Sequence, residues 1–403
     1  MVSSRAEGLR DAMVDRLLSW GGVTSRAVEQ ALRTVPRHMF VPDVPLEDAY
    51  GPESVITHRD ASGVPISSAT GPGGIAMMLE QLGLEPGMRV LEVGAGTGYN
   101  AACLAELVGP TGHVTTVDID AEVTREARDH LNTAGYNRIE VVCGDGVAGY
   151  AANAPYARII VTAGAWDIPP AWREQLAGGG RLVVPLRMRG VTRTVAFRAD
   201  DDGWMSESIA ELGFMPIRGN YGVAEQNLNL GPGSGVWLRI DDGQSVDPDS
   251  LAEALRQPPE VNWSTTVVPL KPFDHLDLWL AGAPGTSVCR VLVEAKAVTA
   301  GLVEPIYPWG SMGVYTSTSF AYLIRRPAEA GEGQEMCEIG VCAYGPDRLW
   351  LAERAAAQVQ AWGRAQQAGT AVHIEVRPHE AAAFPGALLT ADKTRDRVFV
   401  IAG

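Results

Sequence analysis

Residues 90–102 constrain the fold more than any other part of the chain. They join a short apolar run to an Ala/Leu-rich helical pattern through a turn that contains Gly94, Gly96 and Gly98. Glycine adopts positive φ without strain and lets a ligand approach the main chain, and the helix start that follows offers free N–H groups. Dinucleotide sites use Gly-x-Gly-x-x-Gly, whereas Tyr99 stands at the sixth position here. The segment therefore predicts a strand, a ligand-binding turn and a helix, and it disfavours NAD.

Two acidic residues end the next strand-like runs. Asp118 closes the run 114–118, where a carboxylate can accept hydrogen bonds from a ribose diol. Asp145 closes the run 141–145 and is placed to meet an adenine edge. A glycine turn, a ribose acid and an adenine acid in this order predict an S-adenosylmethionine site. The simpler alternatives are that Asp118 caps the next helix and that Asp145 forms an ordinary turn with Gly146.

Strand-like and helix-like patterns alternate between residues 89 and 185. We expect strands over 89–93, 113–118, 138–142, 157–162 and 180–185, and helices over 98–108, 121–134 and 169–177. Such alternation predicts an α/β fold with a doubly wound, Rossmann-like parallel sheet. Its ligand crevice lies at the carboxyl ends of the strands, where the glycine turn and both acids fall.

The pattern changes after residue 219, and a chain of 403 residues is long for one domain. Residues 227–235 resemble a boundary loop, and the run 273–279 predicts an edge strand. Further strand-like runs, which flank a long helical pattern, cover 338–343, 371–376 and 397–401. We therefore expect two domains, 1–219 and 220–403, of which the second is α+β.

Composition narrows the class of function. The net charge is −15 and no Lys/Arg run stands out, which disfavours nucleic-acid partners. The cysteines lack C-x-x-C spacing and the histidines lack metal-ligand spacing, so we expect no metal and a reducing compartment. The chain contains no apolar run of membrane-spanning length and no apolar secretion signal at its start. We expect a cytoplasmic protein with no membrane partner.

Several motifs resemble, in the same order, those of the protein L-isoaspartate O-methyltransferase family. Residues 35–42 (VPRHMFVP) are similar to the family's first motif, 91–99 to its cofactor turn and 144–146 to its adenine turn. The later matching segments are 154–163, 168–170, 175–185 and 214–219. The resemblance covers residues 10–219. It implies a class I S-adenosylmethionine-dependent methyltransferase domain whose product is S-adenosylhomocysteine.

The resemblance also implies roles for individual residues. The cofactor-binding residues, including those predicted from the turn and the two acids, are Glu92, Gly94, Ala95, Gly96, Thr97, Gly98, Asp118, Asp145, Gly146 and Thr162. In the family a Thr-Ile-Ser-Gln-Pro segment forms the substrate-carboxylate site, and residues 68–72 (SATGP) stand at that place. Ser68 and Thr70 keep hydroxyl groups and are the predicted catalytic residues, although threonine replaces serine and Gly71 replaces glutamine. Without the resemblance both would be solvated loop residues.

Two departures from the repair enzyme suggest a variant branch. Residues 56–67 are longer than in that enzyme and predict an inserted hairpin that turns at Ser62-Gly63, with His58 and Arg59 exposed. The repair enzyme ends near residue 220, whereas this chain continues to residue 403.

The extra length, together with the altered substrate segment 68–72, resembles the branch associated with lanthipeptide and other ribosomal-peptide biosynthesis. That resemblance implies methylation of an aspartate in a cyclised precursor peptide, whose ester closes to a succinimide and opens to isoaspartate, with residues 220–403 recognising the peptide. The alternative is a general protein-L-isoaspartate (D-aspartate) O-methyltransferase that acts in protein repair. A non-catalytic scaffold is disfavoured because the glycine turn and both acids are intact.

Overall fold

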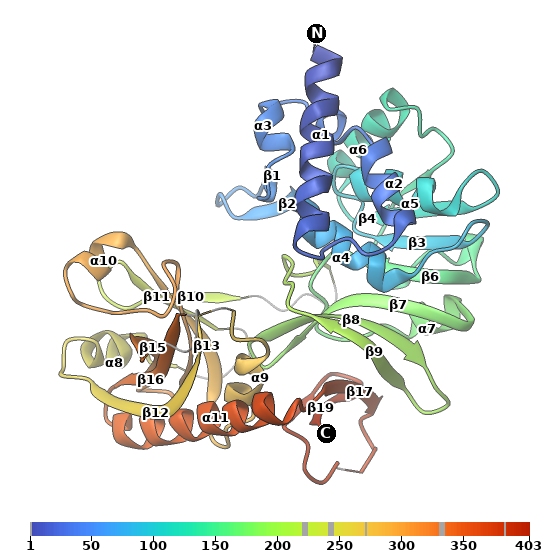
Figure 1. The fold of residues 1–403 in the computed structure, drawn as a ribbon. Coiled ribbons are helices and arrows are strands. Elements are labelled where there is room, and N and C mark those ends of the chain that lie inside the picture. The colour runs from blue at the N-terminus through green and yellow to red at the C-terminus, as the bar shows by residue number, and fades with distance from the viewer. Residues whose placement is uncertain (1, 220–224, 241–245, 271, 330–334, 383) are drawn as a thin grey trace. The chain divides into compact units, whose positions relative to one another are not determined.

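The computed structural model describes the chain except residues 1, 220–224, 241–245, 271, 330–334 and 383 (Figure 1). The chain divides into two compact units: residues 1–186 with 192–222, and residues 187–191 with 223–403. Residues 187–191 were assigned to the first domain from the sequence, but their contacts group them with the second unit.

The first unit contains a sheet whose central strands are parallel. Its strand order is β9 (Trp204–Ala210), β8 (Val191–Ala199), β7 (Leu176–Met188), β6 (Tyr156–Val161), β3 (Arg89–Val93), β4 (His113–Asp118) and β5 (Glu140–Cys143). Parallel pairing joins β7 to β6, β6 to β3, β3 to β4 and β4 to β5, whereas β8 and β9 pair antiparallel. The strand order reverses at β3, which is where doubly wound sheets bind ligands. The predicted doubly wound fold is confirmed.

Two helices of the first unit begin at side-chain caps. The longer ones are α1 (Val2–Ser19), α2 (Arg26–Thr34), α4 (Pro72–Leu82), α5 (Tyr99–Val108) and α6 (Ala121–Thr133), and α3 (Leu46–Ala49) and α7 (Pro170–Gln175) are short. Ser25 caps α2 by accepting the Val28 N–H, and Asp120 caps α6 by accepting two N–H groups. The apolar face of α2 is fully buried at Leu32, and α2 packs against α4 and α5. Each such leucine contributes about 1.5–3 kcal/mol through burial.

The segment before α4 forms the predicted hairpin. Strands β1 (Val55–Arg59) and β2 (Pro65–Ala69) pair antiparallel. At the turn, Gly63 has a φ of +80°, and Asp60 Oδ1 accepts hydrogen bonds from the N–H groups of Ser62 and Val64 at 2.9 Å. The turn at Ser62-Gly63 is confirmed. It brings β2, and with it Ser68, directly to the start of α4.

The second unit is α+β, as predicted, and is rich in strands (Figure 1). Antiparallel pairing gives the order β10 (Gln226–Asn229), β11 (Val236–Ile240), β13 (Ser287–Val293), β14 (Gly310–Tyr315), β15 (Phe320–Pro327), β16 (Met336–Tyr344) and β12 (Glu260–Pro269). Strand β19 (Asp396–Ala402) pairs antiparallel with β17 (Val372–Pro378) and β18 (Leu389–Asp392). Its helices are α8 (Pro248–Ala254), α9 (Leu276–Ala281), α10 (Ala295–Thr299) and α11 (Arg348–Ala368).

The expected edge strand at 273–279 is wrong. That segment leads into α9, in which Leu276, Leu278 and Leu280 are all fully buried. Apolar residues buried on every side of a short helix give the same local pattern as a buried strand, so periodicity alone does not separate the two.

Within the described ranges, no helix is long and apolar enough to cross a membrane. Over the same residues, no group of three or more His, Cys, Asp or Glu side chains is arranged to hold a metal ion.

Glu92, near the end of β3, is an acidic residue in a fully buried position. Its Oε1 accepts a hydrogen bond from Asn100 Nδ2 at 2.7 Å, and its Oε2 accepts one from Thr116 Oγ1 at 2.6 Å. Burial disfavours the charged form and raises the pKa of the Glu92 carboxyl to about 7, although both hydrogen bonds oppose the shift. The Glu92 side chain therefore joins β3 to α5 and β4, and its contribution to the free energy of unfolding depends on pH.

We predict that Glu92→Gln removes one pH-dependent component of stability. The folded pKa of Glu92 lies above the unfolded value of about 4.5. Its stabilising contribution is therefore complete below pH 4.5 and is lost as the pH rises through 7. A shift of this size corresponds to about 3 kcal/mol.

The measurement is the free energy of unfolding of both proteins by denaturant at several pH values between about 5 and 8. The difference between them should change by about 3 kcal/mol in favour of the variant as the pH rises. In the variant, the Thr116 hydroxyl can rotate and accept a hydrogen bond from the new glutamine NH2 group. Parallel pH curves for the two proteins would contradict the prediction.

Candidate functional site

The glycine turn between β3 and α5 is held by the neighbouring strands. Gly94, Gly96 and Gly98 have φ values of +104°, +52° and +88°, which a residue with a side chain rarely adopts. The Gly94 N–H donates to Val117 O at 2.8 Å, and Thr162 Oγ1 donates to Gly94 O at 2.7 Å. A Cβ on Gly94 would lie 2.3 Å from Thr162 Oγ1. The turn therefore needs glycine, and Thr162 acts as its support from the end of β6.

The residues between the glycines are also enclosed. Ala95 and Thr97 are both buried, and His130 Nδ1 lies 3.1 Å from Thr97 O. Glu92 is completely buried, and Asn100 and Thr116 occupy its oxygens. This favours a role for Glu92 in supporting the turn rather than in touching a ligand.

Asp118 presents a carboxylate at the end of β4 beside the glycine turn. Its side chain is 14% exposed. Its Oδ2 accepts a hydrogen bond from the Gly96 N–H at 3.3 Å, and its Oδ1 accepts one from the Asp120 N–H at 3.1 Å. The N-cap of α6 is Asp120, so Asp118 is not the helix cap that the simpler alternative supposed. A partly open carboxylate attached to the turn fits a ribose diol.

Arg218 is a site residue that the sequence analysis missed. Its Nη2 lies 3.8 Å from Asp118 Oδ1, and its Nη1 lies 3.1 Å from Asp120 Oδ2. This pairing contributes to holding the pKa of Asp120 below its usual value, together with the N–H groups that Asp120 caps, although burial acts in the opposite direction. The available signal was the single arginine in the family-like segment 214–219.

Asp145 and Gly146 follow the end of β5 and form the turn into a short 3₁₀ helix. Asp145 Oδ1 accepts the Val147 N–H at 3.0 Å and caps a short 3₁₀ helix, so the turn-forming alternative holds for this oxygen. A Cβ on Gly146 would lie 2.4 Å from Val93 Cγ1, which excludes a side chain there. Trp172 Nε1, on α7, donates to Gly146 O at 2.9 Å and so holds the turn in place.

Residues 214–219 run along the carboxyl ends of the central strands. The Gly164 N–H donates to Met215 O at 2.8 Å, and the Ile217 N–H donates to Gly164 O at 2.9 Å. A Cβ on Gly219 would lie 3.1 Å from Asp145 Oδ2. Through these contacts the segment reaches both acids and forms a wall of the predicted crevice.

The predicted substrate segment lies against the glycine turn. A Cβ on Gly96 would lie 3.6 Å from Ser68 O. Thr70 is half-buried, and its Cγ2 lies 3.1 Å from the position that a Cβ on Gly74 would take. At Gly71, a Cβ would lie 2.6 Å from Pro52 O, so the glutamine of the family pattern does not fit without a shift of that backbone. The structure thus brings Ser68 together with the turn, although the two are separate in sequence.

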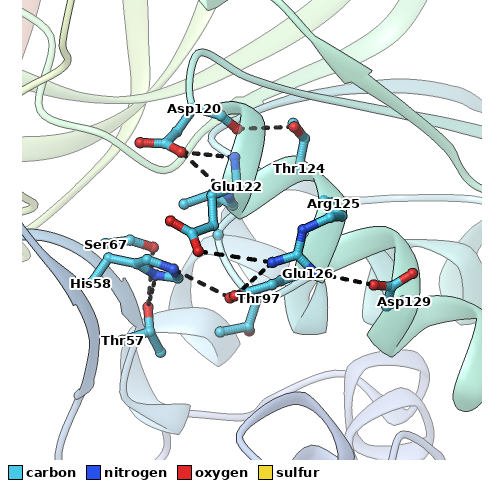
Figure 2. Close-up of polar contacts among 12 residues, drawn as sticks. Thr57, His58, Ser67, Thr97, Asp120, Glu122, Thr124, Arg125, Glu126 and Asp129 are labelled. Atoms are coloured by element: carbon cyan, nitrogen blue, oxygen red, sulfur yellow. Dashed lines mark hydrogen bonds and ion pairs between the residues drawn. The ribbon is translucent and has the colours of Figure 1, made fainter.

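His58 lies against α6 rather than in solvent (Figure 2). Its Nε2 is 3.3 Å from Glu126 Oε2, its side chain is only 20% exposed, and its Nδ1 lies 3.3 Å from Thr57 Oγ1. Thr57 Oγ1 donates in turn to Ser67 Oγ at 3.2 Å. The expectation of an exposed His58 is wrong, because the hairpin folds back onto the helix after β4. Arg59 is exposed, as expected.

Comparisons with known proteins identify the first unit. The family model described as protein-L-isoaspartate(D-aspartate) O-methyltransferase (PCMT) matches residues 9–222. The protein-L-isoaspartate O-methyltransferase of Methanopyrus kandleri is 41% identical over 218 residues, which is 54% of this chain and 94% of that protein. The protein of the same description from Hyperthermus butylicus is 40% identical over 228 residues, which is 54% of this chain and 91% of that protein.

One solved structure resembles nearly the whole chain. It is described as a protein-L-isoaspartate O-methyltransferase and aligns with 98% of this chain and 99% of its own, with a TM-score of 0.52 and 20% identity. At that identity the likeness concerns the fold. The family model covers more than half of the chain. The matched residues include the glycine turn and the two strand-end acids described above. The chain therefore belongs to the protein-L-isoaspartate(D-aspartate) O-methyltransferase family, whose members are S-adenosylmethionine-dependent carboxyl O-methyltransferases.

Proposed function

We propose that this chain methylates the free carboxylate of L-isoaspartyl residues in peptides and proteins, with S-adenosylmethionine as the methyl donor. The observation that carries the proposal is the position of Ser68, whose carbonyl oxygen lies 3.6 Å from where a Cβ on Gly96 would stand. The substrate segment and the cofactor turn are therefore neighbours. Relatives about 40% identical over nearly their whole length have this activity in their names.

A modified precursor peptide is a weaker proposal for the substrate. It rested on the added residues 220–403 and on the altered segment 68–72. A fold that includes such an extension also occurs in a solved structure described simply as a protein-L-isoaspartate O-methyltransferase. The extension therefore does not distinguish the two substrates. The comparisons favour the repair activity, which was the alternative in the sequence analysis.

The residues present suit the chemistry. When bound, S-adenosylmethionine supplies an electrophilic methyl group on a positively charged sulfur. The backbone of the glycine turn and the Asp118 carboxylate would hold its polar groups. The Ser68 and Thr70 hydroxyls would orient one oxygen of the substrate carboxylate and leave the other free to attack.

The reaction requires little acid–base chemistry from the protein. The substrate carboxylate is already ionised at neutral pH, so no general base is needed. A bond forms between a carboxylate oxygen and the methyl carbon, while the electron pair of the breaking carbon–sulfur bond stays on sulfur. The products are a methyl ester and S-adenosylhomocysteine. Alignment of the reacting atoms contributes up to about 7–11 kcal/mol.

We predict that Asp118→Asn weakens the binding of S-adenosylhomocysteine at least tenfold, which is about 1.4 kcal/mol. The charged acceptor for a ribose diol would be lost. Asp120→Asn is the matched control, because Asp120 also contacts Arg218 but caps α6, and asparagine caps a helix as well as aspartate. Calorimetry should show its dissociation constant within about threefold of the wild type. Equal losses in the two variants would refute a ribose-binding role for Asp118.

We predict that an isoaspartyl peptide is methylated with a kcat/KM about 10–200 times that of the aspartyl peptide of the same sequence, since the two differ in the position of one methylene. Transfer of a labelled methyl group to each peptide is the measurement. A cyclised, lanthionine-containing peptide with one aspartate is the third substrate in the same assay. Methylation of only this third peptide would overturn the repair activity and restore the precursor-peptide substrate.

We predict that Thr70→Val lowers kcat at least tenfold and leaves S-adenosylhomocysteine binding unchanged. Valine keeps the methyl group that lies over Gly74 and removes the hydroxyl that would orient the carboxylate. Thr70→Ser is the control, because it keeps the hydroxyl and should retain kcat within about threefold. It should also raise the preference for isoaspartyl over aspartyl peptide, since serine is less rigid than threonine at χ1. Full activity of Thr70→Val would exclude Thr70 from the site.

A further inference from the structure

Arg37 is a buried cation beneath the substrate segment that has no role so far. It begins a 3₁₀ helix, η1 (Arg37–Phe40), and is 1% exposed. Its Nη2 donates to Thr70 O at 2.8 Å and to Ala69 O at 3.3 Å, and its Nε donates to Ala49 O at 2.8 Å. One guanidinium thus fixes the end of β2 and the residue that follows it.

The same guanidinium contacts the cofactor side of the site. Its Cζ lies 4.7 Å from the centroid of the Tyr99 ring. Tyr99 is the first residue of α5 and directly follows Gly98. Phe40 packs edge-on against the same ring, with the centroids 5.7 Å apart. Arg37 therefore joins the substrate segment to the helix that begins at the glycine turn.

Arg37 keeps its charge in a buried position. No carboxylate is among the groups that influence the Arg37 pKa, and burial lowers that pKa. Its Nη1 is buried with no hydrogen-bond partner among the described residues. Replacing a buried charge with an apolar side chain of similar volume is often neutral or stabilising. The cost of keeping this arginine points to a function that an apolar residue does not provide.

We propose that Arg37 is a positioning residue for methyl transfer, which holds the Ala69 and Thr70 carbonyls and so sets the distance between the substrate segment and the cofactor turn. The proposal rests on the proposed function of Thr70. Lysine keeps the charge but, with a single nitrogen, does not reproduce the planar fork that binds Ala49 on one side and Ala69 and Thr70 on the other. Loss of this geometry misplaces the reacting atoms, and small misplacements reduce the rate strongly.

Arg158 provides a matched control. It lies in β6, and its Nε donates to Leu82 O at 2.8 Å and its Nη2 to Gly83 O at 3.3 Å. Burial lowers its pKa as well. It therefore makes the same kind of backbone contacts as Arg37, at the carboxyl end of α4, which is the opposite end from Pro72 and the substrate segment. Arg158 is partly buried, whereas Arg37 is fully buried, but a general effect of losing an arginine that binds backbone carbonyls appears in Arg158→Lys as well.

The experiment compares the wild type, Arg37→Lys and Arg158→Lys as full chains. The readouts are the thermal midpoint, the dissociation constant of S-adenosylhomocysteine, and kcat and KM for the isoaspartyl peptide. For Arg37→Lys we expect a kcat at least tenfold lower, a KM within about threefold of the wild type and unchanged S-adenosylhomocysteine binding. Arg158→Lys should keep kcat within about twofold, whatever its midpoint. A kcat for Arg37→Lys within twofold of the wild type would overturn the proposal, as would equal losses in both variants.

A second variant and a second measurement keep the test decisive. If Arg37→Lys does not unfold cooperatively, Tyr99→Leu removes the ring face beneath the guanidinium, together with the Phe40 contact, and should lower kcat about threefold to tenfold. Amide hydrogen exchange over residues 67–71 tests positioning without any substrate. We expect faster exchange there in Arg37→Lys than in Arg158→Lys, and equal exchange would refute the proposal. If the wild type methylates no isoaspartyl peptide, the proposed function fails, while the exchange result still decides the role of Arg37.

Discussion

The structure of the site depends on how β3 ends between β4 and β6. At that point the Gly94 N–H is bonded to β4 through Val117 O, and the Gly94 carbonyl is bonded to Thr162 just after β6. Both bonds are made by backbone that has positive φ, so the turn leaves the sheet in a single direction. That direction sets where α5 begins. It also places Gly96 beside Asp118 and beside the Ser68 carbonyl. Because parallel strands on both sides fix the turn, the rest of the site can lie on loops.

The acids of the site combine structural and ligand roles in different proportions. Glu92 is fully buried and accepts hydrogen bonds from Asn100 and Thr116, whereas Asp118 receives two N–H groups and remains partly open. Asp145 uses one oxygen as a helix cap. Asp120 takes the capping role for α6 and also pairs with Arg218, which leaves Asp118 free of that duty. Asp120 thus caps α6, while Asp118, two residues earlier, binds the Gly96 N–H in the glycine turn.

Local patterns predicted those parts of the fold and site that depend on neighbours in sequence. The strands 89–93 and 113–118 were recognisable because short runs rich in valine, leucine and threonine lead directly to a glycine or an aspartate. The α9 helix was mistaken for a strand because a short apolar run suits both. Arg37 and Arg218 were missed because their partners, Thr70 and Asp118, are distant in sequence, and an isolated arginine carries no periodic signal.

The substrate segment is held at two places by bonds of unequal strength. On β1, His58 Nε2 lies 3.3 Å from Glu126 Oε2 of α6, and a partly exposed contact of this kind contributes about 0–1 kcal/mol and is weakened by salt. After β2, Arg37 is shielded from water and binds backbone carbonyls, so neither salt nor side-chain motion releases it easily. The β1 side of the hairpin is therefore held less firmly than the backbone at Thr70. Glu126 belongs to α6, which follows β4, and Tyr99, over which Arg37 lies, begins α5, which follows β3. The hairpin is therefore held against the two helices that follow the strands ending at the predicted cofactor site.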